Sequence, residues 1–273
     1  MKRFAGKVAW VTGASSGIGE AIARAFADEG AALILSGRRV DALQAVADDL
    51  DTDCLVLPFE ATDFAVLDGV VDRAWAWKQK VDLLINNAGI SQRSIAMETS
   101  PEVYRTLLDI DLMAPIWLTQ LQLPKMAVAG GGHIVAISSV AGRIGVPLRT
   151  AYCAAKHGLI GYMDALRTEV ESLHNIKVTN ILPGSVATNV SRNAITSDGS
   201  TRGRSDETID NGDDPADCAA SILDAIVANK RELIFAKGQE LEMAKLRHQD
   251  ADTFFDLVSG FGRHIIKTHE NEG

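Results

Sequence analysis

A glycine-rich turn, TGASSGIG at residues 12–19, joins a short apolar run at 8–11 to a stretch of helical periodicity at 19–28. Backbone N–H groups in such a turn can approach a phosphate at the positive end of the helix dipole. The turn alone is also compatible with a tight strand-to-helix connection. A P-loop is disfavoured, because Glu20 and Ala21 stand where that motif needs Lys and Ser or Thr. The candidate phosphate contacts are Gly13, Ser15, Ser16, Gly17, Ile18 and Gly19.

The alternation of strand and helix continues along the chain. Apolar runs rich in Val, Ile and Leu recur at 8–11, 32–35, 55–57, 83–85, 134–137, 178–182 and 233–235. Amphipathic stretches lie between them at 19–28, 40–50, 64–78, 102–127 and 152–172. Short, wholly apolar runs are typical of buried parallel strands. The pattern therefore predicts an α/β fold of Rossmann type, with a doubly wound, parallel, seven-stranded sheet in a single domain over 1–273.

The composition indicates a soluble globular chain. Hydrophobic residues make up 47% and charged residues 23%, and the net charge of −9 argues against a nucleic-acid partner. Cys54, Cys153 and Cys218 are odd in number and widely spaced, so we expect neither a disulfide framework nor a metal site. The chain offers no signal-peptide core and no apolar run long enough to span a membrane. We expect a cytoplasmic protein.

The stretch 189–215 departs from the alternation, because it is polar, rich in Ser, Asp and Gly, and long for a connection within a compact domain. It follows the carboxyl end of the run at 178–182, where ligands of such sheets bind. We therefore expect a substrate lid at 189–215, the alternative being a disordered insertion in its middle.

Apolar side chains recur at near-helical spacing between residues 254 and 266. Such a segment can meet lipid or substrate. We expect it instead to pack against the body of the protein or against a second subunit.

Arg38 and Arg39 follow the second apolar run, about twenty residues beyond the glycine turn. In dinucleotide-binding folds an acidic residue at this position hydrogen-bonds a ribose 2′-hydroxyl. A guanidinium instead forks onto a 2′-phosphate, which an Asp would repel. The pair therefore predicts NADP(H) in preference to NAD(H), and the alternative is two solvated arginines at a helix start.

Tyr152 and Lys156 are four positions apart, so on a helix they share one face. A neighbouring ammonium stabilises a phenolate, which suits a tyrosine to general acid or base chemistry. Taken alone, the pair could equally be an aromatic core residue beside a surface lysine. Ser139 adds specificity, because it follows the run at 134–137 and brings a hydroxyl to the same edge of the sheet.

These motifs resemble, in order, those of the short-chain dehydrogenase/reductase family over residues 5–240. The resemblance is carried by TGASSGIG, NNAG at 86–89, Ser139, Tyr152 with Lys156, and Pro183 and Gly184 with Thr188. Within that family the dehydrogenase/reductase member 7 group is similar at SQRS, HIVAISS, YCAAKH and NAITSDGS. The group's proteins are membrane-associated and act on apolar carbonyls, but this chain starts at its first strand, so we expect no anchor.

The resemblance implies a role for each motif. Tyr152 would deliver the proton, Lys156 would assist it and hold the nicotinamide ribose, and Ser139 would hydrogen-bond the carbonyl oxygen. The remaining candidates for cofactor contact are Asn87, Ala88, Gly89, Pro183, Gly184 and Thr188, the last holding the carboxamide. Packing at strand ends is the alternative for these residues.

Two positions depart from the family. Glu60 replaces the Asp expected after the third strand, but it is long enough to reach the adenine amine. Asp111 replaces an Asn that helps to hold a water linking Lys156 to solvent. A carboxylate there could keep the relay, hold Lys156 charged or slow turnover, and the alternative is a helix residue paired with some cation.

The sequence thus predicts an NADP(H)-dependent oxidoreductase that interconverts a ketone or aldehyde and an alcohol. A non-catalytic or regulatory nucleotide-binding protein would share the fold but would have little use for Ser139, Tyr152 and Lys156. The substrate walls are expected at 91–93, 142–150 and the lid. Their arginines, Arg93, Arg143 and Arg149, permit an anionic ligand or are solvated. By resemblance we expect a homo-oligomer, either a dimer or a tetramer.

Overall fold

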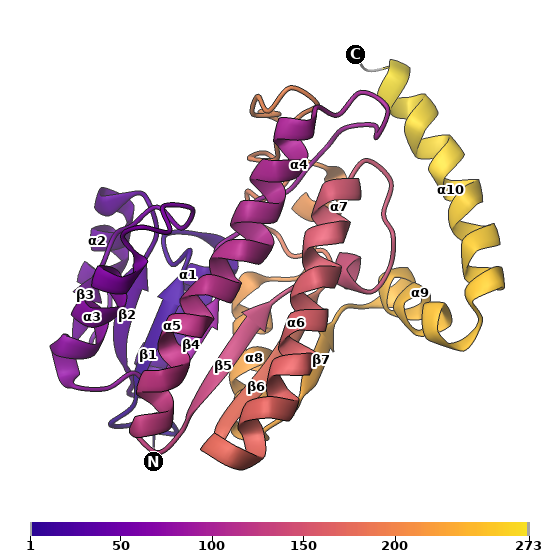
Figure 1. Ribbon diagram of the computed structural model, residues 1–273. Helices are drawn as coiled ribbons and strands as arrows, with labels where there is room; N and C mark the ends of the chain where they lie inside the picture. Colours follow the sequence, from indigo (N-terminus) through magenta and orange to yellow (C-terminus); the bar gives the residue numbers. More distant parts are fainter. Residues whose placement is uncertain (1, 272–273) are drawn as a thin grey trace.

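Seven parallel strands form the centre of the molecule, as the computed structural model of residues 2–271 shows (Figure 1). Their order is β3-β2-β1-β4-β5-β6-β7. The strands are β1 (Val8–Thr12), β2 (Ala32–Ser36), β3 (Cys54–Val56), β4 (Leu83–Asn86), β5 (Gly132–Ile137), β6 (Ile176–Pro183) and β7 (Glu232–Phe235). This confirms the predicted doubly wound sheet. The order reverses between β1 and β4, which is where such sheets open a ligand cleft at their carboxyl ends.

Helices cover both faces of the sheet, and the alternation of side chains along each strand explains why. Ala9 and Val11 of β1 belong to one apolar cluster, whereas Val8 and Trp10 belong to another on the opposite face. The first face is covered by α1 (Gly17–Asp28), α2 (Val40–Asp48) and α8 (Pro215–Val227). The second is covered by α3 (Leu67–Lys78), α5 (Ala114–Val128) and α6 (Thr150–His174).

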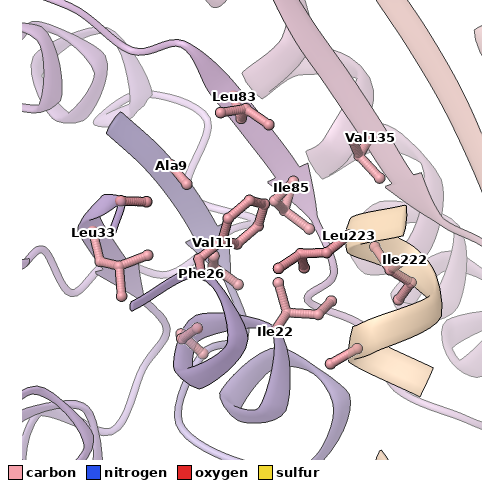
Figure 2. Close-up of a cluster of buried hydrophobic side chains, with 14 of the residues drawn as sticks. Ala9, Val11, Ile22, Phe26, Leu33, Leu83, Ile85, Val135, Ile222 and Leu223 are labelled. Carbon is pink, nitrogen blue, oxygen red and sulfur yellow. The ribbon is translucent and has the colours of Figure 1, made fainter. Parts of the chain in front are cut away.

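The first cluster ties the amino-terminal half of the chain to α8. Figure 2 shows Ile22 and Phe26 of α1 between the side chains of β1 and those of α8, with Ile222 and Leu223 contributed by α8. All four are fully or almost fully buried. Burying an aliphatic or aromatic side chain contributes about 1.5–3 kcal/mol. This cluster therefore fixes the glycine turn, which lies between β1 and α1, relative to the sheet.

The predicted helix at 102–127 proves to be three consecutive segments. They are α4 (Pro101–Leu108), a π-helical turn, η1 (Asp109–Met113), and α5. Ser100 caps the start of α4, because its hydroxyl accepts a hydrogen bond from the N–H of Val103. The wider π turn was not predicted, since its residues have ordinary helical periodicity. It places the side chain of Asp111 in a fully buried position.

The stretch 189–215 contains local secondary structure of its own. Isolated bridges pair Ile195 with Gln92 and with Thr201, and α7 (Glu207–Asp210) lies within the stretch. The polar composition is thus satisfied by local hydrogen bonds rather than by solvent alone.

Two helices, α9 (Gly238–Gln249) and α10 (Ala251–Asn271), project beyond the β7 edge of the sheet (Figure 1). Phe254 is fully buried, packed with the 3-10 turn η2 (Val140–Gly142), as the sequence predicts for this segment. Phe255, Phe261 and other apolar residues of α10 remain about half exposed, so its packing against the body is only partial. Within residues 2–271, every helix is too short or too polar to cross a bilayer.

Candidate active site

A cavity of about 570 Å³ opens at the carboxyl ends of β1, β2, β4, β5 and β6. It brings together every candidate site residue except Asp111, which lies buried behind it. The candidates that line it are Gly13, Ser15, Ser16, Gly17, Ile18, Gly19, Arg38, Arg39, Glu60, Asn87, Ala88, Gly89, Ser139, Tyr152, Lys156, Pro183, Gly184 and Thr188. Residues distant in sequence therefore meet in one hollow.

The glycine turn presents main-chain groups to this cavity. Gly13 has a left-handed φ of 66°, and a Cβ atom at Gly19 would lie 2.3 Å from the Gly13 carbonyl oxygen. The Ser16 side chain makes no capping hydrogen bond to α1, which leaves the first N–H groups of that helix available to an anion. This geometry suits the diphosphate of a dinucleotide.

The hydroxyl of Thr12 joins the glycine turn to the loop after β4. It accepts hydrogen bonds from the backbone N–H groups of Asn87 and Ala88, both at 3.0 Å. The Asn87 amide in return donates to the Thr12 carbonyl oxygen at 2.9 Å. The two loops therefore form one rigid wall of the cavity.

Arg38 and Arg39 lie at the end of β2 and are weakly engaged. Arg39 donates to the hydroxyls of Ser15 and Ser16, both at 3.0 Å. The Arg38 guanidinium is 3.7 Å from the Glu60 carboxylate, and its side chain is 68% exposed. An exposed pair at that distance contributes little to stability, so Arg38 is available to a ligand. Both arginines face the cavity rather than only the solvent.

Ser139, Tyr152 and Lys156 reach the cavity from β5 and α6. The Ser139 hydroxyl donates to the Pro183 carbonyl oxygen at 3.3 Å and accepts from the N–H of Ala141 at 3.1 Å. The Lys156 ammonium donates to the Ile137 carbonyl oxygen at 3.3 Å and lies 5.6 Å from the centre of the Tyr152 ring. The three side chains are thus neighbours on one wall of the cavity.

The Asp111 carboxylate lies behind Lys156, as the sequence predicts. Its Oδ1 is 3.9 Å from the Lys156 ammonium and accepts from the N–H of Ile90 at 2.9 Å. Within residues 2–271, Oδ2 has no hydrogen-bond partner. Burial raises the pKa of Asp111 to about 6, against the opposing effects of Lys156 and the Ile90 N–H. A Cβ on Gly89 would lie 2.6 Å from Oδ1, so only glycine leaves room for this carboxylate.

Gln92 positions the start of α6, a role that the sequence did not reveal. Its buried Oε1 accepts from the N–H of Ala151 at 2.9 Å and of Tyr152 at 3.4 Å. Arg149, the residue before the helix, makes no capping hydrogen bond with its side chain. The amide of Gln92 therefore caps the helix that carries Tyr152. The only sequence signal was the SQRS motif, which does not show what it contacts.

The expected substrate walls need a correction. Residues 91–93 and 142–150 are not among those lining the cavity, whereas five residues of the stretch 189–215 are: Asn189, Val190, Asn193, Thr201 and Ile209. Arg93 and Arg149 pair with Asp206, and Arg143 pairs with Glu232. The interpretation of these arginines as solvated was wrong, because each of them pairs with a carboxylate far away in the sequence. Apolar cavity residues that the sequence did not single out include Phe59, Ile90, Ile110, Pro115 and Leu118.

Comparisons with known proteins agree with this geometry. A family model described as short chain dehydrogenase matches residues 7–198. Dehydrogenase/reductase SDR family member 7B from Bos taurus is 38% identical over 93% of this chain and 80% of its own length. Its counterpart from Danio rerio is 41% identical over 84% of this chain and 77% of its own length. These relatives confirm the resemblance to the member 7 group.

Solved structures share the fold. A short-chain dehydrogenase from Streptomyces avermitilis superposes with a TM-score of 0.80 at 29% identity, covering 96% of this chain and 99% of that one. An enzyme of the same family from Burkholderia phymatum, solved with NAD, gives a TM-score of 0.82 at 23% identity, covering 93% and 96% of the two chains. With these matches added to its motifs and its cavity, the chain belongs to the short-chain dehydrogenase/reductase family and is an NAD(P)-dependent oxidoreductase.

Proposed function

We propose that this protein uses NADP(H) to interconvert a ketone or aldehyde and an alcohol, with Tyr152 as the general acid or base. The observation that carries the proposal is that Ser139, Tyr152 and Lys156 line the same cavity as the glycine turn and the two arginines. A site that only bound a nucleotide would need the turn and the arginines. It would not need a hydroxyl, a phenol and an ammonium grouped on one wall.

The chemistry follows from what each side chain can do. The bound dinucleotide supplies or accepts the hydride. In the direction of reduction, Tyr152 donates its phenolic proton to the carbonyl oxygen as negative charge develops there. Ser139 donates a hydrogen bond to the same oxygen and stabilises that charge. In oxidation Tyr152 accepts the proton from the alcohol instead.

Lys156 supports the proton transfer electrostatically. Its ammonium lies close to the Tyr152 ring, and a buried positive charge favours the phenolate form. Lys156 would also hold the hydroxyls of the nicotinamide ribose, and Thr188 the carboxamide. Both residues line the cavity.

Asp111 acts on this set through Lys156, and we assign it a positioning role. Its carboxylate stabilises the ammonium when ionised, but its own field opposes the formation of a phenolate at Tyr152. Because burial raises the pKa of Asp111 to about 6, its charge would change between mildly acidic and neutral pH. Asp111 would therefore make the turnover depend on pH in a way that an Asn would not.

The preference for NADP(H) rests on Arg38 and Arg39. Two guanidinium groups at the end of β2 suit a 2′-phosphate, and Glu60 can turn from Arg38 to the adenine amine. Among solved structures with this fold, one holds NAD and another 5-hydroxy-NADP, so the fold accommodates both kinds of cofactor. The choice therefore depends on these side chains.

The stretch 189–215 would form the substrate lid, because five of its residues line the cavity. We further expect a cytoplasmic, homo-oligomeric enzyme with a small carbonyl or alcohol as its substrate.

A screen of carbonyl compounds tests the proposed reaction and the role of Tyr152. The purified chain is incubated with NADPH and ketones or aldehydes of increasing size, and the loss of NADPH absorbance is followed. Tyr152→Phe is run in parallel to subtract contaminating activity. Turnover that disappears in this variant supports the proposal, whereas NADPH binding with no turnover of any carbonyl or alcohol would refute it.

A further inference from the structure

Five polar side chains form a largely buried cluster where the lid meets the loop after β4 and the start of α6. We call them the Asp206 cluster: Arg93, Arg149, Ser191, Arg202 and Asp206. Oδ2 of Asp206 lies 2.5 Å from one terminal nitrogen of Arg93 and 3.5 Å from one of Arg149. Its Oδ1 lies 2.5 Å from Arg202. The Ser191 hydroxyl is within hydrogen-bond distance of Arg93, Arg202 and the N–H of Asp206.

Burial makes this cluster different from a surface ion pair. The Arg93 side chain is 3% exposed and that of Asp206 is 21% exposed. Burial lowers the pKa of Arg93 to about 10, while the guanidinium groups hold the pKa of Asp206 far below its usual range. Three cations share one carboxylate here. Removing the carboxylate would leave the cations facing one another in a poorly solvated space.

The cluster joins segments that are distant in the sequence. Arg93 belongs to the loop after β4, and Arg149 directly precedes α6. Ser191 lies near the start of the lid, whereas Arg202 and Asp206 lie in its second half. Backbone hydrogen bonds from Arg93 to Ile195 and from Ile195 to Ser91, both at 2.9 Å, run beside it. Asp206 therefore ties the lid to the two segments that frame Tyr152.

The lid residues held in this way reach the cavity. Thr201 directly precedes Arg202, Asn193 follows Ser191 by two positions, and Ile209 lies one turn beyond Asp206. All three line the cavity that also contains Tyr152. A movement of Asp206 away from Arg93 would therefore move the wall of the cavity itself.

We propose that Asp206 is the latch of the lid: its ion pair with Arg93, reinforced by Arg149 and Arg202, holds residues 189–215 closed over the cavity, and its release opens the route for the carbonyl substrate. The inference deepens the proposed function and rests on it for the identity of what enters. Arg93 and Asp206 are positioning residues, since neither lines the cavity.

Limited proteolysis of the full-length protein tests the latch without nucleotide or substrate. Trypsin can cut the lid after Arg192, Arg202 or Arg204, and mass spectrometry identifies the fragments. Cleavage of a folded protein follows the population in which the segment is open. Asp206→Asn should raise the rate of lid cleavage by about tenfold or more, because a neutral amide cannot compensate three guanidinium groups.

Asp198→Asn is the matched control, because it makes the same change elsewhere in the same lid. The Asp198 carboxylate accepts hydrogen bonds only from Thr196 and Ser200 among its described contacts, and an amide oxygen can still accept them. Its rate of lid cleavage should stay within about twofold of the parent. Lid cleavage of Asp206→Asn at the parental rate, or equal sensitisation of both variants, would overturn the latch.

A milder variant keeps the test decisive if Asp206→Asn does not fold. Arg202→Gln leaves the pair of Arg93 and Asp206 in place and still leaves trypsin sites at Arg192 and Arg204. Lid cleavage should then rise by about threefold, and an unchanged rate would refute the latch. Because no turnover is required, a failed carbonyl screen leaves these outcomes readable and refutes only the proposed function.

Discussion

Arg38 on the nucleotide side of the cavity and Arg93 beneath the lid carry the same guanidinium group in opposite surroundings. The Arg38 side chain is 68% exposed, and its nearest carboxylate, that of Glu60, is 3.7 Å away. The Arg93 side chain is 3% exposed and lies 2.5 Å from the carboxylate of Asp206. The nucleotide side thus presents positive charge that the protein leaves largely uncompensated. On the lid side, by contrast, the Arg93 guanidinium is buried and already engaged by the Asp206 carboxylate.

This difference suits the two sides to different kinds of recognition: the nucleotide side to recognition by charge, and the lid side to recognition by shape. An exposed, loosely paired guanidinium loses little when a phosphate replaces its partner, so the nucleotide side is ready for an anion. A buried, fully engaged guanidinium cannot bind a ligand without first losing a short ion pair. Under the latch proposal, the lid side would control access to the cavity instead of attracting an anion. Four variants test this division, and they are ordered here by the size of the expected effect.

Tyr152 lies on the wall between the two sides. Tyr152→Phe should separate nucleotide binding from catalysis. The ring still packs, but the transferable proton is lost. We expect turnover to fall by about two to four orders of magnitude, while the dissociation constant of NADPH changes little. Steady-state rates and a fluorescence titration of the nucleotide measure the two quantities. Turnover equal to that of the parent would remove Tyr152 from the mechanism.

Arg38→Asp combined with Arg39→Asn should reverse the charge of the nucleotide side. We expect the affinity for NADPH to fall by about a hundredfold and that for NADH by much less, because only NADPH carries the 2′-phosphate. Titration of both nucleotides against the parent and the double variant measures the change. If the parent already prefers NADH, our interpretation of the arginine pair is wrong.

Asp206→Asn should affect the lid side alone. We expect the KM for the carbonyl to change by about tenfold as the wall formed by the lid loosens, with the dissociation constant of NADPH nearly constant. Asp198→Asn serves again as the control and should keep the parental KM. A loss of NADPH affinity as large as the change in KM would show that the two sides are not independent.

Asp111→Asn should have the smallest effect on turnover, which we expect to be equal or higher, with NADPH affinity nearly unchanged. One limb of the pH–rate profile should shift, because an amide does not titrate. A profile that superimposes on the parent's at equal turnover would show that Asp111 is only a structural helix residue.

The same substitution has a consequence for stability. Burial raises the pKa of Asp111 to about 6, above that of an exposed Asp, so the folded state binds this proton more tightly than the unfolded state. The parent therefore loses stability as the pH rises through about 4 to 6. The free energy of unfolding of Asp111→Asn, relative to the parent, should increase from pH ~4.5 to pH ~7. Urea denaturation at both values measures it.

The sequence predicted the fold well, because its strands are short apolar runs whose type depends on local composition. It also predicted the candidate cofactor and catalytic residues that line the cavity, since parallel strands bring their carboxyl ends to one edge, but not the substrate walls, which it placed at 91–93 and 142–150. It could not pair Arg93 with Asp206, which are 113 positions apart, because a guanidinium looks the same in sequence whether it is solvated or buried. Nor could the sequence show the π turn at Asp111, because the apolar residues of this segment have the spacing of an ordinary helix.

The π turn between α4 and α5 also determines how far α4 is rotated about the helix axis relative to α5. Each residue of an α-helix turns the chain by about 100°, and a widened turn absorbs one extra residue. Val103 and Leu107 of α4 therefore contact Ala151, while Leu118 of α5 faces the sheet. Deleting one residue within 109–113 would restore a regular helix and rotate α4 away from the start of α6. In an alignment of relatives, a one-residue gap here would mark a differently shaped site, although no residue lining the cavity of this chain need differ.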